Sequence, residues 1–293
     1  MTKPVRSYRS RQTRAVGAIL TLGIPGLFLL LFVAVPLGVV LVSAFFKRGR
    51  IGGFKPEFTL ENFAELTRPV YAQVLGSSLL MSATVTLICL VVAYAAVWAM
   101  RTLTPRGRII ALVAILIPFW TSFLIRAYAW MLLLGDAGTI NGALQLFGVI
   151  ETPLRMLYSP EAVILVLVYL YLPLMILPLA ASAEGLDSSL GDAARNLGAS
   201  PWRSFRTVDL PLTLPGALTG AVLVFVPSMS NFVVPDLIGG GRVLLIGNVI
   251  QDQFLVARNW PLGSVLALVL LLLLVLLLVA QSMVIRRIQG GSK

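Results

Sequence analysis

The sequence predicts an all-α membrane protein with six transmembrane helices, and three observations support this prediction. First, 58% of the 293 residues are hydrophobic and only 12% are charged, a composition typical of membrane proteins. Second, the chain contains six apolar segments, each near or above the ~20 residues that a helix needs to cross the bilayer core. Third, Lys and Arg concentrate in alternate connecting segments, which indicates an orientation. The predicted spans are residues 16–46, 74–100, 109–134, 162–183, 216–237 and 264–285.

The first span, residues 16–46, follows a basic tail at residues 1–15. A basic tail before an apolar segment is also typical of a cleaved secretory signal, for which Val42-Ser43-Ala44 resembles a cleavage site. The apolar run is longer than the ~7–15 residues of such signals. We therefore expect residues 16–46 to remain in the protein as a membrane helix.

The next two spans carry the less regular residues of the predicted bundle. Residues 74–100 contain the only cysteine, Cys89, which lies in an apolar run and is expected to pack there. A single cysteine also excludes a disulfide framework within the chain. Residues 109–134 are interrupted by Pro118 and carry Arg126 near the far end. We expect Arg126 to pair with an acidic residue or to reach the membrane interface.

The last three spans differ mainly in their prolines. Residues 162–183 and 216–237 each contain two prolines, which membrane helices tolerate where neighbouring helices satisfy the freed backbone groups. We expect these prolines to produce packing kinks. Residues 264–285 include the run 265–280, which contains no polar residue.

The charge distribution predicts that both termini face the cytoplasm. With the N-terminus inside, fourteen basic and four acidic residues lie on the cytoplasmic side, against eight basic and eight acidic residues outside. The net charges are then about +10 and zero, as the positive-inside rule requires. Orientation thus explains the overall charge of +11 without a nucleic-acid partner. The cytoplasmic segments would be residues 1–15, 101–108, 184–215 and 286–293. Outside, residues 58–66 have helical spacing and form either a short surface helix or a solvated loop.

The cytoplasmic loop at residues 184–215 is predicted to form two short helices joined by a turn. Gly198 suits the left-handed conformation that ends a helix, and Ser200-Pro201 suits the start of the next one. Leu210-Pro211 is expected to end that second helix. The alternative is that the loop merely packs against its own bundle. Four residues favour a partner surface, namely the flat pair Ala193 and Ala194 and the aromatic pair Trp202 and Phe205.

This loop resembles the EAA loop of binding-protein-dependent ABC importer permeases. The family pattern is Glu-Ala-Ala, three residues, Gly, nine residues, a branched apolar residue, one residue and Leu-Pro. Every spacing is kept here, with Asp192 in place of Glu and Val208 in place of Ile. The resemblance implies that the loop docks on a cytoplasmic ATPase. The residues implied are Asp192, Ala193, Ala194, Gly198, Ala199, Trp202, Phe205, Val208, Leu210 and Pro211.

Further segments resemble the spermidine/putrescine permease subfamily, notably residues 118–130, 171–178 and 259–263, and the resemblance covers about residues 70–285. It implies a type I importer fold in the bacterial cytoplasmic membrane. It also implies a second homologous permease, two ABC ATPase subunits and an extracytoplasmic binding protein. ATP and Mg would be held by the ATPase and no cofactor by this chain. The solute would be a polyamine or another small organic or cationic molecule.

The sequence contains no phosphate-binding Gly-x-x-x-x-Gly-Lys-Ser/Thr motif, so the chain cannot bind ATP in that way. It also lacks a His–Glu metal pair and a Gly-x-Ser-x-Gly motif, which argues against an intramembrane hydrolase. An ion-coupled secondary carrier is the main alternative, but such carriers place ionisable residues at mid-membrane, where this chain has almost none. A structural or sensor subunit would not need the helical hairpin predicted at residues 184–215.

Seven residues near the predicted outer ends of the spans are candidates for the solute path, because a polyamine needs carboxylates or aromatic faces. The aromatic members also suit an aromatic belt at the membrane interface. Asp236, which precedes the glycine triplet 239–241, also suits a solvated turn. The candidates are Asp236, Asp136, Asp252, Trp120, Tyr128, Trp130 and Tyr169.

Overall fold

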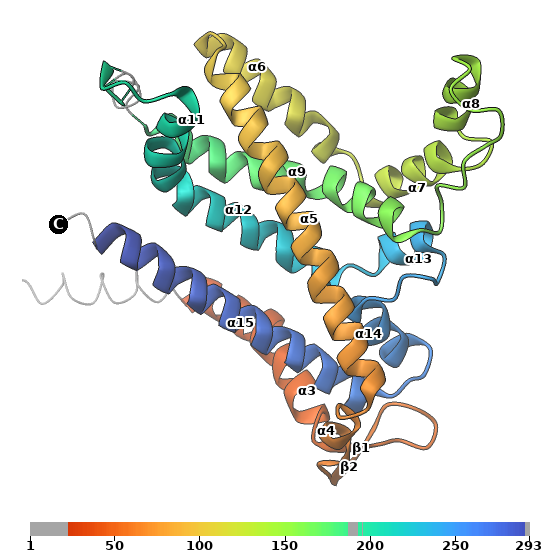
Figure 1. Ribbon diagram of the computed structural model, residues 1–293. Coiled ribbons are helices and arrows are strands. Elements are labelled where there is room, and N and C mark those ends of the chain that lie inside the picture. The colour runs from red at the N-terminus through yellow and green to blue at the C-terminus, as the bar shows by residue number, and fades with distance from the viewer. Residues whose placement is uncertain (1–22, 187–192, 195, 291–293) are drawn as a thin grey trace, which may run out of the picture.

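The computed structural model describes residues 23–186, 193–194 and 196–290, which form a bundle of long helices with a small two-stranded sheet at one end (Figure 1). The predicted tail 1–15 and the first part of the predicted span 16–46 lie outside the described residues.

The elements follow one another along the chain with short connections. The first half comprises α2 (Ile24–Leu29), the π-helical segment η2 (Leu30–Ala34), α3 (Val35–Ser43), β1 (Phe46–Arg48), β2 (Phe54–Phe58), α4 (Glu61–Glu65), α5 (Pro69–Arg101), α6 (Pro105–Leu116), η3 (Ile117–Trp120), α7 (Phe123–Leu134) and α8 (Thr139–Leu146). The second half comprises α9 (Pro160–Glu184), α11 (Pro201–Ser204), the π-helical segment η4 (Phe205–Asp209), α12 (Leu210–Ser230), α13 (Val233–Gly239), α14 (Ile246–Leu255) and α15 (Trp260–Gly290).

Six stretches of the described chain are helical, long and apolar enough to cross a membrane, which confirms the predicted fold class. They are Pro25–Ser43, Pro69–Arg101, Phe123–Leu146, Pro160–Glu184, Pro201–Ser230 and Trp260–Arg287. The sheet is one addition that the all-α prediction did not contain, since β1 and β2 pair antiparallel in the loop between the first two membrane helices.

The core lies where α5, α9 and α12 pack against one another, with α13 at one end. Its fully buried side chains include Val85, Leu167 and Val224. The helices α9 and α12 approach closely because Gly216 has no side chain. A Cβ at that position would lie against the Ser182 hydroxyl and 2.5 Å from the Pro178 carbonyl oxygen. Burial of such apolar and small surfaces holds the helix pair together.

The second helix of the loop does not end at Leu210-Pro211, which corrects the sequence expectation. The helix runs without a break from Pro201 to Ser230. A proline ring inside a regular α-helix clashes with the carbonyl four residues earlier, here that of Thr207. The wider π-helical turn η4 surrounds that carbonyl and accommodates the ring, with the Leu210 N–H bonded to the Phe205 oxygen.

The third and fifth predicted spans have different bounds in the structure. Residues 109–134 are divided after η3, because Thr121 and Ser122 are extended before α7 begins. The helix predicted at 216–237 ends at Ser230, and the extended Asn231 accepts the Val234 N–H to begin α13.

The loop between the first two membrane helices is held by one buried side-chain amide, that of Asn62. The alternative of a surface helix within residues 58–66 is the one observed, as α4. The Asn62 side chain on α4 donates hydrogen bonds to the Ala44 and Phe46 carbonyl oxygens at 3.0 and 2.9 Å. These bonds join α4 to the end of the first membrane helix and to β1.

Candidate coupling site and solute path

The turn of the hairpin at residues 184–215 has the backbone that the sequence predicts. Gly198 adopts φ +82°, the left-handed conformation. The Ala199 N–H then bonds to the Ala194 carbonyl oxygen at 3.0 Å, and the Leu197 N–H bonds to the Ala193 oxygen at 3.1 Å. A bond that reaches back five residues across a left-handed glycine is the Schellman arrangement that ends a helix. The predicted docking residue Asp192 lies outside the described residues.

The second helix of the hairpin begins where the sequence predicts. The Ser200 hydroxyl accepts the Arg203 N–H at 3.3 Å, and Pro201 occupies the first helical position. Ser200 therefore satisfies one of the free N–H groups at the helix start. Because the same helix continues to Ser230, the hairpin is rigidly joined to a membrane span.

The two aromatic residues of the hairpin face different surroundings. Trp202 is 67% exposed, and beside the turn Leu197 is 90% exposed, so both are free to meet a partner. Phe205 instead stacks on the Trp98 ring, with centroids 4.5 Å apart, and meets the edge of Tyr94 at 5.6 Å. The expectation that both aromatics form an outward surface thus holds for Trp202 alone. Phe205 packs the hairpin against α5.

The side chains of the remaining predicted coupling residues are either exposed or half-buried. Ala193 is exposed and Ala194 is half-buried on the short first helix. Val208 and Leu210 are half-buried on the second, and Pro211 is exposed.

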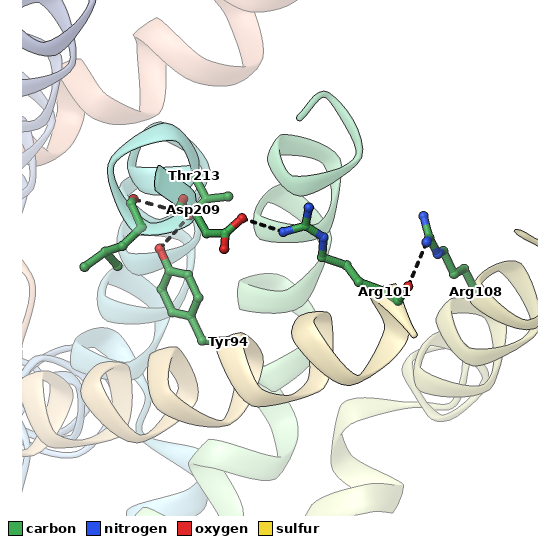
Figure 2. Close-up of polar contacts among 6 residues, drawn as sticks. Tyr94, Arg101, Arg108, Asp209 and Thr213 are labelled. Carbon is green, nitrogen blue, oxygen red and sulfur yellow. Dashed lines mark hydrogen bonds and ion pairs between the residues drawn. The ribbon is translucent and has the colours of Figure 1, made fainter. Parts of the chain in front are cut away.

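A polar network that the sequence reading missed lies beside Phe205 (Figure 2). Arg101 Nη1, at the end of α5, donates to Asp209 Oδ1 at 2.6 Å, and Arg108 Nη2 donates to the Arg101 carbonyl oxygen at 2.9 Å. The Tyr94 and Thr213 hydroxyls are 3.1 Å apart. No local pattern in the sequence signalled the ion pair, because Arg101 and Asp209 are 108 positions apart.

Two of the candidate carboxylates, Asp236 and Asp252, lie at the opposite end of the bundle, where the charge of Asp252 acts on Asp236. Asn248 Nδ2 donates to Asp236 Oδ1 at 2.5 Å and to the Phe232 carbonyl oxygen at 2.9 Å. Asp236 lies on α13, beyond the end of the fifth span. Partial burial raises the pKa of its carboxyl, the Asn248 hydrogen bond opposes this rise, and the nearby Asp252 adds to it. Asn248 therefore orients one carboxylate of an acidic pair.

The candidate aromatic residues are divided between packing and exposure. Trp130 and Tyr169 meet edge to face, with centroids 5.3 Å apart, and join α7 to α9. Trp120 is 82% exposed and Tyr128 is 49% exposed. Asp136 is exposed in the turn between α7 and α8.

Arg126 departs from both surroundings that the sequence suggested. It is only 9% exposed, so it does not reach the interface, and it forms no ion pair with any described acidic residue. Its guanidinium carbon lies 5.3 Å from the centre of the Phe119 ring, which provides a cation–π contact. The fold places α7 against the core here, so the arginine packs under an aromatic face.

Comparison with known proteins identifies the chain. The family described as binding-protein-dependent transport system inner membrane component matches residues 16–290. The chain belongs to this family. The permease is 44% identical to the spermidine/putrescine transport system permease protein PotB of Haemophilus influenzae over 82% of this chain and 84% of that one. Its identity to PotB of Escherichia coli is 43%, over 83% and 88%. It is 34% identical to the Escherichia coli inner membrane ABC transporter permease protein YdcU, over 73% and 72%.

Solved structures share the fold of the permease. A bacterial alginate ABC transporter, crystallised with an alginate pentasaccharide-bound periplasmic protein, superimposes with a TM-score of 0.75 over 95% of this chain and 96% of that one, at 15% identity. The inward-facing MetNI methionine ABC transporter gives 0.54 over 76% and 99%, at 18% identity. The permease is therefore a multi-pass inner-membrane subunit with an ABC importer permease fold.

Proposed function

We propose that this permease passes a polyamine, of the spermidine/putrescine class, from an extracytoplasmic binding protein to the cytoplasm. The observation that carries the proposal is the 44% identity to a spermidine/putrescine permease over most of both chains. The acidic pair at Asp236 and Asp252 and the aromatic pair at Trp130 and Tyr169 provide groups of the kind that a cation needs.

The proposed assembly contains a second homologous permease, two cytoplasmic ABC ATPases and the binding protein. Both termini and the loop 184–215 lie in the cytoplasm, where the ATPase docks on the hairpin and supplies ATP and Mg. The hairpin presents an exposed Trp202 and an exposed Leu197 for this contact. ATP-driven closure of the ATPases moves the hairpin and thereby the membrane helix that continues from it.

The test is to purify the complex through a tag on this chain and to reconstitute it with its binding protein in vesicles. We expect uptake of labelled spermidine or putrescine that requires both ATP and the binding protein. Labelled methionine and alginate serve as control solutes. ATP-dependent uptake of a different solute would reject the polyamine but keep the importer. Uptake by the isolated chain, driven by an ion gradient, would instead establish the secondary carrier.

The acidic pair gives a sharper test of the path. We expect Asp236→Asn to raise the KM for spermidine uptake about five- to thirtyfold, the effect of losing a charge-assisted contact of ~1–2 kcal/mol. Glu151→Gln, in an exposed outer loop, is the matched loss of a carboxylate. Equal KM values for both variants would remove Asp236 from the path.

The orientation is tested separately with single cysteines. In a Cys89→Ala background, Gly198→Cys should react with a membrane-impermeant maleimide only from the cytoplasmic side, and Gly53→Cys only from outside. The opposite pattern would invert the proposed topology.

A further inference from the structure

The hairpin and α5 meet along two matching stripes of side chains. On the helix that starts with α11, the stripe is Phe205, Asp209 and Thr213, spaced four residues apart. On α5 it is Tyr94, Trp98 and Arg101, which also share one face of the helix. Each member touches its counterpart through a ring contact, an ion pair or a hydroxyl hydrogen bond. The contact therefore combines a stacked ring pair with an ion pair and a hydroxyl hydrogen bond.

The ion pair is shielded more than an ordinary surface pair. The Asp209 side chain is 17% exposed and that of Arg101 31% exposed, whereas the outer pair of Arg68 and Glu65 is 63% and 35% exposed. Coulomb attraction is stronger where less water screens it, and a single remaining charge is costly there. Arg101 also lies in the last turn of α5, where the helix dipole favours a positive charge.

A third helix is connected through the backbone of the same arginine. Arg108 on α6 donates to the Arg101 carbonyl oxygen, so the ends of α5 and α6 are tied at the point where Asp209 holds the side chain (Figure 2). Any displacement of η4 thus acts on α5 directly, and on α6 through this hydrogen bond and the short connection at residues 102–104. The neighbouring Thr213 hydroxyl donates to the Asp209 carbonyl oxygen at 2.7 Å, which keeps the residue within its helix.

We propose that Arg101 and Asp209 are positioning residues that transmit movement of the coupling hairpin to α5 and α6. This inference rests on the proposed ATP-driven importer and adds the route by which the hairpin acts on the bundle. Packed rings, hydrogen bonds and ion pairs between two helices carry a displacement of one helix to the other. The ion pair is the one charged link between the described part of the hairpin and α5.

The experiment measures solute imported per ATP hydrolysed in the reconstituted complex. We expect Arg101→Gln and Asp209→Asn to lower this ratio about five- to 150-fold, the range of a typical coupling free energy. The conservative variant Arg101→Lys should retain most of it. Arg68→Gln, which breaks the exposed outer pair, is the control and should keep the wild-type ratio. The pH and salt concentration are held constant, because salt screens the exposed Arg68–Glu65 pair more strongly than the shielded Arg101–Asp209 pair.

The charge-reversed pair separates transmission from a requirement for folding. Arg101→Asp and Asp209→Arg should each uncouple, and the double variant should recover part of the ratio, because the pair is restored while the helix dipole is opposed. Tyr94→Phe removes only one hydroxyl and should lower the ratio slightly in the same direction. Wild-type ratios in both Arg101→Gln and Asp209→Asn, with normal amounts of complex, would overturn the proposal. A wild-type complex that lacks ATP-dependent uptake would instead contradict the importer itself.

Discussion

The first and fifth membrane helices contain the same local backbone feature in different surroundings. Each has a five-residue π-helical segment, Leu30–Ala34 or Phe205–Asp209, with a proline two residues beyond it at Pro36 or Pro211. In both helices the N–H between the segment and the proline bonds to the oxygen five residues back. The wider turn accommodates a ring that a regular helix would not.

The surroundings of the two segments differ in contact. Leu30 and Leu31 in the first segment are 55% and 50% exposed, so they face lipid or another subunit. In the second segment, Phe205 and Asp209 are held against α5 by ring stacking and an ion pair. In both helices, the proline and its π-helical turn set where the helix widens. Whether movement at that turn reaches other helices depends on the contacts around it.

The largest expected difference between these regions is in packing. Gly216→Ala, in the fifth helix, introduces a Cβ against Ser182 and Pro178, whereas the Cβ of Gly38→Ala meets nothing within 4 Å. We expect Gly216→Ala to cost about 1–3 kcal/mol and to lower the thermal midpoint of the purified complex by roughly 2–10 °C. Gly38→Ala should leave the midpoint unchanged. Equal midpoints would show that α9 and α12 adjust freely.

A second test acts at the hairpin turn that precedes the fifth helix. Gly198 has φ +82° and open space around it, so Gly198→Val strains the backbone without a clash. We expect solute uptake per ATP hydrolysed to fall at least about fivefold, as for ~1–3 kcal/mol of strain released by a changed turn. Gly198→Asn should retain coupling, because Asn tolerates the left-handed region. Gly26→Val, in the first helix, is the control, and a loss of coupling there would break the comparison.

The smallest expected effect is at the prolines themselves. Pro211→Ala allows the π-helical segment to tighten into a regular helix and should reduce uptake per ATP about two- to threefold, the scale of ~0.5 kcal/mol. Pro36→Ala changes the same backbone feature in an exposed helix and should leave this ratio unchanged. If Pro36→Ala has the larger effect, the first helix takes part in coupling.

Local patterns in the sequence were sufficient for much of the fold and of the hairpin. Apolar length predicted the six membrane helices, because a bilayer selects for long runs of apolar residues irrespective of their neighbours. Gly198 and Ser200-Pro201 predicted the turn, because their backbone preferences act within a few residues. The helical spacing of residues 58–66 was also a local pattern, and the helix at Glu61–Glu65 was one of the two alternatives that it left open.

Other features depend on residues that are distant in the sequence. Arg101 and Asp209 are separated by 108 positions, and neither residue alone indicates its partner. The spacing of Trp202 and Phe205 suggested that both side chains face outward, but Phe205 stacks on the Trp98 ring of α5 instead. The helix continues through Pro211 because the π-helical turn η4 precedes it and packs on α5. The helix propensities of single residues do not predict such a turn.

The lengths of the apolar runs and the backbone preferences at Gly198 and Ser200-Pro201 are local properties. The order of the amino acids is therefore sufficient to predict six membrane helices and a hairpin with a left-handed glycine turn. Three further features arise in the folded protein: the hairpin is continuous with a membrane helix, an ion pair fastens it to α5, and Arg126 packs against Phe119. These outcomes follow from long-range packing, in which the surroundings of a side chain are supplied by other helices.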